Sequence, residues 1–508
     1  MLKIKQLIGT VLIALPVIAT FSGCEKFLDR KPLSASVDDL QIGKLDGQVL
    51  GLYGAVRNSK SEPFIGDGFE NIPWVAMNGF RSDDAENVAD PGASGWHQTY
   101  DNFQYTKDDW GAGMYWNKHY VLAGLCNDIL QLAEDEGYTD PQSLVNIAEA
   151  RFFRAYAYFD MVRTFGEVPK IDFKINNPAD ANIEKSDTAE IYELIHADLT
   201  YAEQYLPLLW EPKFAGRLTS GAAKTLHAKA LMYQKRYSEA LPLLRDVITS
   251  NQYSLYTPYW KIFKKEGELC SESIFEIQAA KSAGDGDVYW SRLGQCQGVR
   301  GGSGAWDLGW GWNTPSASLV DAYETGDVRK EATILFSNQS DGGNNTGGYG
   351  LTLPNLTNAL YWNKKVYNNY NDYLDAGLGT PQNEAQNTWV NHRVLRFADA
   401  LLLAAEAANE IGGTQNENDA ETWVNMVRSR AGLPDISFVN QAQMRLAIKQ
   451  ERRVEFGMEF ERFFDLVRWG DAITVLNSLG YQNKHRYFPI PSGALNANPN
   501  LTQNPEWP

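Results

Sequence analysis

The stretch KQERRVEFGMEFERFFDLVRWG occupies residues 449–470, near the end of the chain. Its bulky apolar residues recur at i, i+4, i+7 and i+11, the spacing of one helical face: Phe456, Phe460, Phe463 and Val467. Gly457 lies inside this pattern, so we expect it to kink or divide the helix. The stretch therefore predicts a helix whose aromatic face packs on a core.

The same stretch carries nearly balanced charge, which has two interpretations. An arginine buries its stem and holds its planar fork on a carboxylate, which would give paired ions at the edge of a core. Alternatively, this is a surface helix with i,i+3 and i,i+4 ion pairs, as most charge runs are. The charged residues are Arg452, Arg453, Arg462 and Arg468 with Glu451, Glu455, Glu459, Glu461 and Asp465.

Length and composition indicate a large globular protein. The 508 residues suffice for one or two domains, and 44% hydrophobic with 21% charged residues is ordinary for that class. A formal charge of −17 argues against nucleic acid and anionic membrane surfaces as partners. Aromatic residues make up 12% of the chain, which hints at a stacking surface.

The N-terminus has the features of a lipoprotein signal peptide. Lys3 and Lys5 precede an apolar run, Leu7 to Phe21, that is too short to span a membrane. Small residues then precede Cys24. We expect residues 1–23 to be removed and Cys24 to carry a lipid anchor, with 24–508 as a single domain. Simple secretion with Cys24 unmodified is the alternative.

The three remaining cysteines leave at least one thiol unpaired. Cys126 lies in a helical pattern, which favours a small buried hydrophobic residue. Cys270 and Cys296 have the option of forming a bridge, which the sequence leaves open.

Apolar periodicity predicts a mainly α fold built of helical pairs. Asp140 is an N-cap followed by proline, at the start of a helix that runs to about Phe165. Stripes at 222–233 and 240–247 predict a tight hairpin resembling a tetratricopeptide unit, and 396–410 with 419–431 form another pair. Because the spacing between pairs is irregular, we expect a tetratricopeptide-like scaffold and no regular solenoid.

Two regions lack this periodicity. Residues 71–113 and 281–388 are rich in Gly, Asn, Asp, Trp and Tyr. Such composition predicts large irregular loop insertions with short strands, mounted on the helical scaffold.

Several motifs resemble the SusD/RagB family. The stretch quoted first contains E-R-R-x-E-F at 451–456 and E-R-F-F-D-L-x-R-W-G at 461–470, which is similar to the family signature. Members are surface lipoproteins of Bacteroidetes that bind nutrients, usually glycans, beside a TonB-dependent outer-membrane transporter. The resemblance therefore implies outer-membrane anchoring at the cell surface and a SusC-like transporter as partner. Further matching segments are 24–32, 151–166, 396–399, 428–432, 487–491 and 498–505.

No motif for catalysis or metal binding is recognisable. Six histidines are scattered singly, and H-E-x-x-H, C-x-x-C, G-x-S-x-G and P-loop patterns are missing from the sequence. We therefore predict no catalytic residue, no cofactor and no metal. A pair of carboxylates suited to glycoside hydrolysis stays open, because 63 acidic residues always supply some pair.

Aromatic residues in the two loop regions are the candidate ligand contacts. Alternation in an extended chain would send Trp310 and Trp312 to the same face, where indole rings stack on sugars. The other interpretation is that these tryptophans pack the loops together, since Trp is usually mostly buried. One side of the candidate site is Trp306, Trp310, Trp312, Tyr289 and Trp290, and the other is Trp96, Tyr100, Asn102 and Trp110 with Asn78 and Arg81.

Three functions follow from these features. The first is a lipid-anchored surface protein that binds a glycan, neutral given the acidic chain, and passes it to a transporter without breaking bonds. The second is an extracytoplasmic helical-repeat adaptor that binds proteins. The third is a lipid-anchored polysaccharide hydrolase.

Lipidation of Cys24 has a direct test. Acyl chains on Cys24 would hold the protein in the detergent phase of a detergent partition, because each buried methylene contributes about 0.8 kcal/mol. Cys24→Ala should move the protein to the aqueous phase. A wild-type protein that also stays aqueous contradicts the anchor.

Overall fold

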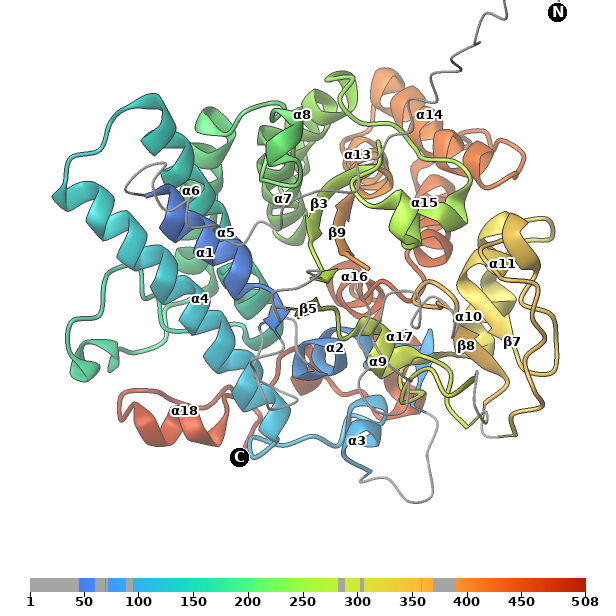
Figure 1. Ribbon diagram of the computed structural model, residues 1–508, viewed down its shortest axis with the longest axis horizontal. Coiled ribbons are helices and arrows are strands. Elements are labelled where there is room, and N and C mark those ends of the chain that lie inside the picture. The colour runs from blue at the N-terminus through green and yellow to red at the C-terminus, as the bar shows by residue number, and fades with distance from the viewer. Residues whose placement is uncertain are drawn as a thin grey trace, which may run out of the picture. The chain divides into compact units, whose positions relative to one another are not determined.

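A row of consecutive helices forms the scaffold in the computed structural model (Figure 1). Each helix packs on the next, and α13 packs on α8 although residues 250–396 lie between them. The prediction of a mainly α, tetratricopeptide-like fold is confirmed. The row consists of α4 (Trp110–Asp135), α5 (Pro141–Phe165), α6 (Thr188–Tyr205), α7 (Ser220–Tyr233), α8 (Tyr237–Thr249), α13 (Phe397–Ile411), α14 (Thr414–Arg430) and α15 (Gln441–Glu455).

The structure describes residues 45–508 except 60–68, 70–71, 88–94, 282–287, 302–305, 358 and 369–389. The predicted signal peptide and the predicted lipidation site Cys24 lie outside the described residues. Within the described part, no helix is long and apolar enough to cross a membrane.

Local signals start and stop the helices where the sequence places them. The Asp140 carboxylate accepts a hydrogen bond from the backbone N–H of Ser143, and Gly166, with φ of 78°, ends α5. Thr219 caps α7 in the same way by accepting from Ala222. The predicted hairpin is therefore confirmed as α7 and α8.

The regions expected to be loops contain more helix than predicted. All eight residues of α2 (Ile72–Gly79) are buried, so this helix has no polar face and no amphipathic period in the sequence. Other short helices are α1 (Asp46–Ala55), η3 (Gly95–His97), α3 (Gln98–Asp101), α9 (Leu293–Gln297), α10 (Ala317–Ala322), α11 (Val328–Thr333), α16 (Arg462–Trp469), α17 (Ala472–Leu476) and α18 (Ser492–Ala497).

Short antiparallel strands connect the insertions to the scaffold. The described sheets pair β1 (Asn58–Ser59) with β5 (Val288–Trp290), and β5 with β4 (Ala280–Lys281). The other pairs are β2 (Ala85–Glu86) with β6 (Thr314–Pro315), β3 (Ser273–Ile277) with β9 (His392–Arg396), and β7 (Ile334–Phe336) with β8 (Tyr361–Asn363).

The three cysteines in the described part of the structure are free thiols. Cys126 is buried, as predicted, and burial raises the pKa of its thiol. Cys270 and Cys296 are unpaired, so the bridge that the sequence left open does not form. Burial raises the pKa of Cys296 to about 12.

The stretch at 449–470 is two helices and a strained connection. α15 ends at Glu455 and α16 begins at Arg462. Between them Met458 and Phe460 adopt left-handed conformations, with φ of 68° and 71°. The expected division is confirmed. Phe456 and Phe463 are buried in the core and Phe460 and Val467 pack against it, but the division places them on separate elements and not on one helical face.

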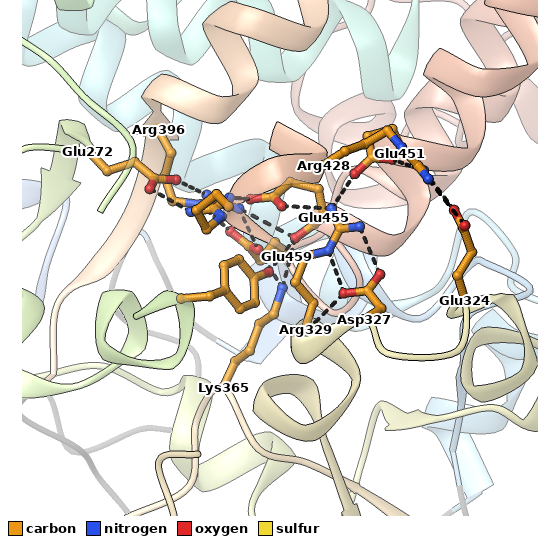
Figure 2. A network of polar contacts seen from close by, with 12 residues as sticks. Glu272, Glu324, Asp327, Arg329, Lys365, Arg396, Arg428, Glu451, Glu455 and Glu459 are labelled. Carbon is orange, nitrogen blue, oxygen red and sulfur yellow. Dashed lines mark hydrogen bonds and ion pairs between the residues drawn. The ribbon is translucent and has the colours of Figure 1, made fainter. Parts of the chain in front are cut away.

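A buried ion network surrounds Glu455, the last residue of α15 (Figure 2). Its carboxylate accepts hydrogen bonds from Arg430 at 2.5 Å, Arg396 at 3.0 Å and Arg329 at 3.1 Å. Burial alone would raise the pKa of Glu455, but the three arginines outweigh it and the pKa lies well below the usual value. The prediction of a solvated surface helix is therefore wrong, and these ions lie inside the protein.

The network extends to segments far from α15 in the sequence. Arg396 and Arg430 also bind Glu272, which directly precedes β3, and Arg329 binds Glu451 and Asp327. Most of these pairs are long-range and link the insertion containing α11 with the helical row. The members are Glu272, Asp327, Glu451, Glu455 and Glu459 with Arg329, Lys365, Arg396, Arg428 and Arg430.

Glu455→Gln should destabilise the fold strongly. Removing one partner of a buried ion pair leaves uncompensated charge and costs about 3–5 kcal/mol of unfolding free energy. Denaturant unfolding measures this loss. Glu239→Gln is the matched control, since Glu239 pairs with Arg236 at the surface.

The pH dependence of this stabilisation follows from the lowered pKa of Glu455. The contribution is complete above the ordinary glutamate value of 4.5 and is lost as the solution becomes more acidic. Equal unfolding midpoints for the Glu455→Gln and Glu239→Gln proteins would contradict the importance of the network.

Candidate functional site

Four tryptophans from two distant segments meet in one cluster. The ring centroids of Trp96 and Trp110 are 5.1 Å apart, those of Trp96 and Trp312 are 5.4 Å apart, and those of Trp310 and Trp312 are 4.6 Å apart. We call these four residues the tryptophan cluster. The sequence placed these residues on two sides of one site, and the structure brings them together.

A tight turn, and not an extended strand, directs Trp310 and Trp312. Gly311 has φ of 70°, and an added Cβ there would lie 2.9 Å from both Arg300 and Trp362, so only glycine fits. The backbone N–H groups of Trp310 and Trp312 donate to carbonyls in α9, each at 2.8 Å. The turn at Gly311, and not the alternation of an extended strand, therefore brings the two rings together.

The tryptophan cluster is open to solvent. Trp110 is 42% exposed, and Trp96, Trp310 and Trp312 are half-buried. Trp110 begins α4, where the Asp109 carboxylate caps the helix by accepting from Ala112. Rings that are fixed at one edge and exposed at another offer a rigid apolar surface for a ligand, with little conformational entropy to lose.

Three predicted ligand contacts lie in the interior instead. Asn78 is 2% exposed, and Arg81 and Tyr100 are fully buried, so a ligand at the surface does not reach them. The Arg81 guanidinium lies 3.8 Å from the ring centroid of Phe463. Burial raises the pKa of Tyr100, whose hydroxyl donates to Asp109. The burial of these three residues does not fit the prediction that they line the site.

The remaining candidates fall elsewhere. Trp306 stacks on Tyr367, with centroids 5.8 Å apart, in a second apolar cluster. Tyr289 and Trp290 lie in β5, and their side chains are outside the described part of the structure. Asn102 is exposed directly after α3 and stays a predicted contact.

One residue of the site was not predicted from the sequence. The imidazole of His97 stacks on Trp312, with centroids 5.3 Å apart and planes 22° apart. The sequence showed His97 only as one isolated histidine. Its position beside Trp96 was the one available signal.

Two arginines of the stretch 449–470 hold this site in place. Arg453 and Arg462 bind Asp83 at 2.9 Å and 2.8 Å, and Arg453 binds Asp84 at 2.7 Å. These two aspartates lie directly before β2, which pairs with β6 just after Trp312. The ion pairs therefore connect α15 and α16 with the segment that carries the cluster.

One pocket formed by the described residues is small. A cavity lined by Phe263, Lys365 and Phe460 among others has a volume of about 50 Å³, which holds a few water molecules and no sugar ring. Among the described residues, no group of three His, Cys, Asp or Glu side chains is placed to hold a metal ion. The exposed tryptophan rings are the surface that this site offers to a ligand.

A helical-repeat scaffold that carries an exposed aromatic surface defines a class of binding protein, and sequence comparison identifies the family. Residues 271–507 match the model described as "SusD family", and residues 64–232 match "Starch-binding associating with outer membrane". This chain belongs to the SusD family.

Individual relatives agree with the family models. The chain is 28% identical to SusD-like protein P2 of Formosa agariphila over 451 residues, which are 83% of this chain and 85% of that protein. A structure titled "Laminarin binding SusD-like protein" has a TM-score of 0.75 and 26% identity, covering 91% of this chain and 99% of the other. Surface glycan-binding protein A from Bacteroides thetaiotaomicron, in complex with laminarihexaose, has a TM-score of 0.72 and 25% identity, with 91% and 98% coverage.

Proposed function

We propose that this protein captures a neutral glycan on the tryptophan cluster at the cell surface and passes it to a TonB-dependent transporter without breaking a bond. The observation that carries the proposal is the meeting of Trp96 and Trp110 with Trp310 and Trp312 at an open surface. Each indole face stacks on the C–H face of a sugar ring and removes apolar surface from water.

The chemistry of the site favours a neutral and loosely held ligand. A formal charge of −17 disfavours polyanionic glycans by bulk repulsion. Each aromatic contact contributes about 0.5–1.5 kcal/mol beyond the area that it buries. Two or three such contacts, less the cost of ordering the glycan, give an affinity in the roughly micromolar to millimolar range. Weak binding suits transfer to a second protein.

The named relatives support the ligand class. Two similar structures are titled as a laminarin-binding protein and as a surface glycan-binding protein in complex with laminarihexaose. Laminarin is therefore the first glycan to test in a panel of neutral polysaccharides.

Affinity electrophoresis tests the site. Trp110→Ala and Trp312→Ala should each weaken binding about tenfold, because each removes one stacking surface, and should reduce retardation in a gel containing the glycan. Trp306→Ala is the matched control, since Trp306 packs in the second apolar cluster. Far-UV circular dichroism should be unchanged in all three.

Two outcomes would contradict this assignment. Wild-type retardation in both cluster variants would place the site elsewhere. Release of reducing sugar from a bound polysaccharide, abolished by changing one carboxylate, would make the protein a hydrolase.

The helical scaffold is the proposed docking surface for the transporter. Val121 is 56% exposed and Leu125 40% exposed on α4, and Phe173 is 37% exposed in the loop beside it. The Asn127 side-chain amide holds this loop on α4 by donating to the carbonyls of Ile171 and Phe173. The result is an apolar surface on the scaffold.

Pull-down from native membranes in mild detergent should recover a large β-barrel protein with the wild type. Leu125→Asp should lose it, because docking would bury a charge. Trp312→Ala is the control and should retain it. Recovery of the lipoprotein alone, with the barrel present in the lysate, counts against a complex with the transporter.

A further inference from the structure

A chain of polar groups, of which Asn87 and Asn313 are buried and Asp101 is partly buried, joins the two segments that build the tryptophan cluster. The Asp101 carboxylate accepts two hydrogen bonds from Asn87, one from the backbone N–H at 2.7 Å and one from Nδ2 at 2.6 Å. Asn87 Oδ1 in turn accepts the backbone N–H of Asn313 at 2.9 Å. Asp101 ends the helical segment that contains Trp96, and Asn313 directly follows Trp312.

The hydrogen-bonded residues Asp101, Asn87 and Asn313, which we call the relay, end at the turn that carries Trp312. Asn87 is 5% exposed and Asn313 is 1% exposed, so water does not replace a lost bond. Asn313 has φ of 49°, a left-handed conformation that its contacts must maintain. Its side chain also donates to Gln297 at 2.8 Å in α9.

We propose that Asp101 is a positioning residue of the glycan site: through Asn87 it fixes Asn313 and so holds Trp312 against Trp96 when its carboxylate is ionised. The consequence for glycans rests on the proposed function, whereas the assembly of the tryptophan cluster does not. Protonation of Asp101 loosens the cluster.

The strength of the hydrogen bonds between Asp101 and Asn87 depends on whether the Asp101 carboxyl is ionised. An ionised carboxylate accepts from both N–H groups of Asn87 with its full charge, whereas a protonated one is neutral and has less acceptor capacity, so its two bonds to Asn87 are weaker. Burial raises the pKa of Asp101 to about 7, although the two bonds from Asn87 oppose the rise, and Glu86 on β2 adds to it. The change therefore falls at neutral pH.

Other titratable groups surround the relay. His97 lies in η3 and stacks on Trp312, and an imidazole also changes charge near neutral pH. Asp109 caps α4 and binds the Tyr100 hydroxyl. A test must therefore separate Asp101 from His97.

Stability and cluster order have opposite pH dependences in this account. Because burial raises the pKa of Asp101 above its usual 3.8, ionising it lowers the free energy of unfolding between about pH 4 and pH 7. If the Asp101 carboxyl acted only through overall stability, the tryptophan cluster would therefore be best ordered in acid, where the protein is more stable. A positioning carboxylate gives the best-ordered cluster above pH 7.

Fluorine NMR of protein labelled with 5-fluorotryptophan reads the cluster directly. The full chain carrying Cys24→Ala is used without glycan, and the Trp312 resonance is assigned with Trp312→Phe. We expect this resonance to move with a midpoint near pH 7 in the wild-type background and in His97→Gln, and to lose that titration in Asp101→Asn. An unmoved wild-type resonance between pH 5 and pH 9 overturns the inference, as does a titration that His97→Gln removes and Asp101→Asn retains. If Asp101→Asn fails to fold, the His97→Gln profile decides: a titration that persists there supports the inference, and its loss overturns it.

Laminarihexaose titrations at pH 8 and pH 5.5 form the second arm. The wild type should bind about tenfold more weakly at pH 5.5, and Asp101→Asn should bind about tenfold more weakly than wild type at pH 8, with no further loss in acid, as expected for one bond to a charged group. If Trp312→Ala weakens binding about tenfold while Asp101→Asn matches the wild type at both pH values, the inference fails and the proposed function stands. If the resonance titrates as expected but no glycan of the panel binds, the inference stands and the proposed function fails.

Discussion

The buried carboxylate of Glu455 is the constraint on which the other parts of this structure depend. It is fully buried, and three arginines from β9, α14 and the start of α11 converge on it. A charge in such a place is tolerated only with its partners in position, because desolvation costs several kcal/mol for each ion. The partners come from segments more than a hundred residues apart, so the network fixes how the insertions sit on the helical row.

The consequences of this constraint reach the tryptophan cluster through the next residues of the chain. After Glu455 the backbone turns through the left-handed residues Met458 and Phe460, which places Arg462 beside Asp83. Asp83 and Asp84 then anchor β2, and β2 pairs with β6 next to Trp312. Burial raises the pKa of Asp84 against the opposing effect of Arg453 and Arg462, so this anchor also depends on its partners. Rings that are held by such a frame need little reordering when a ligand binds.

The sequence predicted the parts of the fold that local chemistry decides. The helix beginning at Asp140 and the hairpin of α7 and α8 have capping residues and apolar stripes that are visible in the chain. α2 was missed because every face of it is buried, which removes the polar side that reveals a helix.

Long-range contacts were beyond the reach of the sequence. Most ionic partners in the network lie in other segments, so nothing local distinguished a buried network from a solvated helix. Trp310 and Trp312 were predicted from their proximity in the chain. Arg81 and Tyr100 looked like surface groups because charged and phenolic side chains are seldom fully buried, and only packing shows otherwise.

The central claim is that the exposed tryptophan cluster is where the glycan binds. Hydrogen-exchange mass spectrometry of the protein with and without a saturating neutral glycan tests this claim most directly, because it reports on backbone protection along the whole chain at once. The account predicts slower exchange at residues 95–110 and 306–313, with no change in α13 and α14. Protection confined to the helical row, or no protection at those two segments when the glycan is bound, would contradict it.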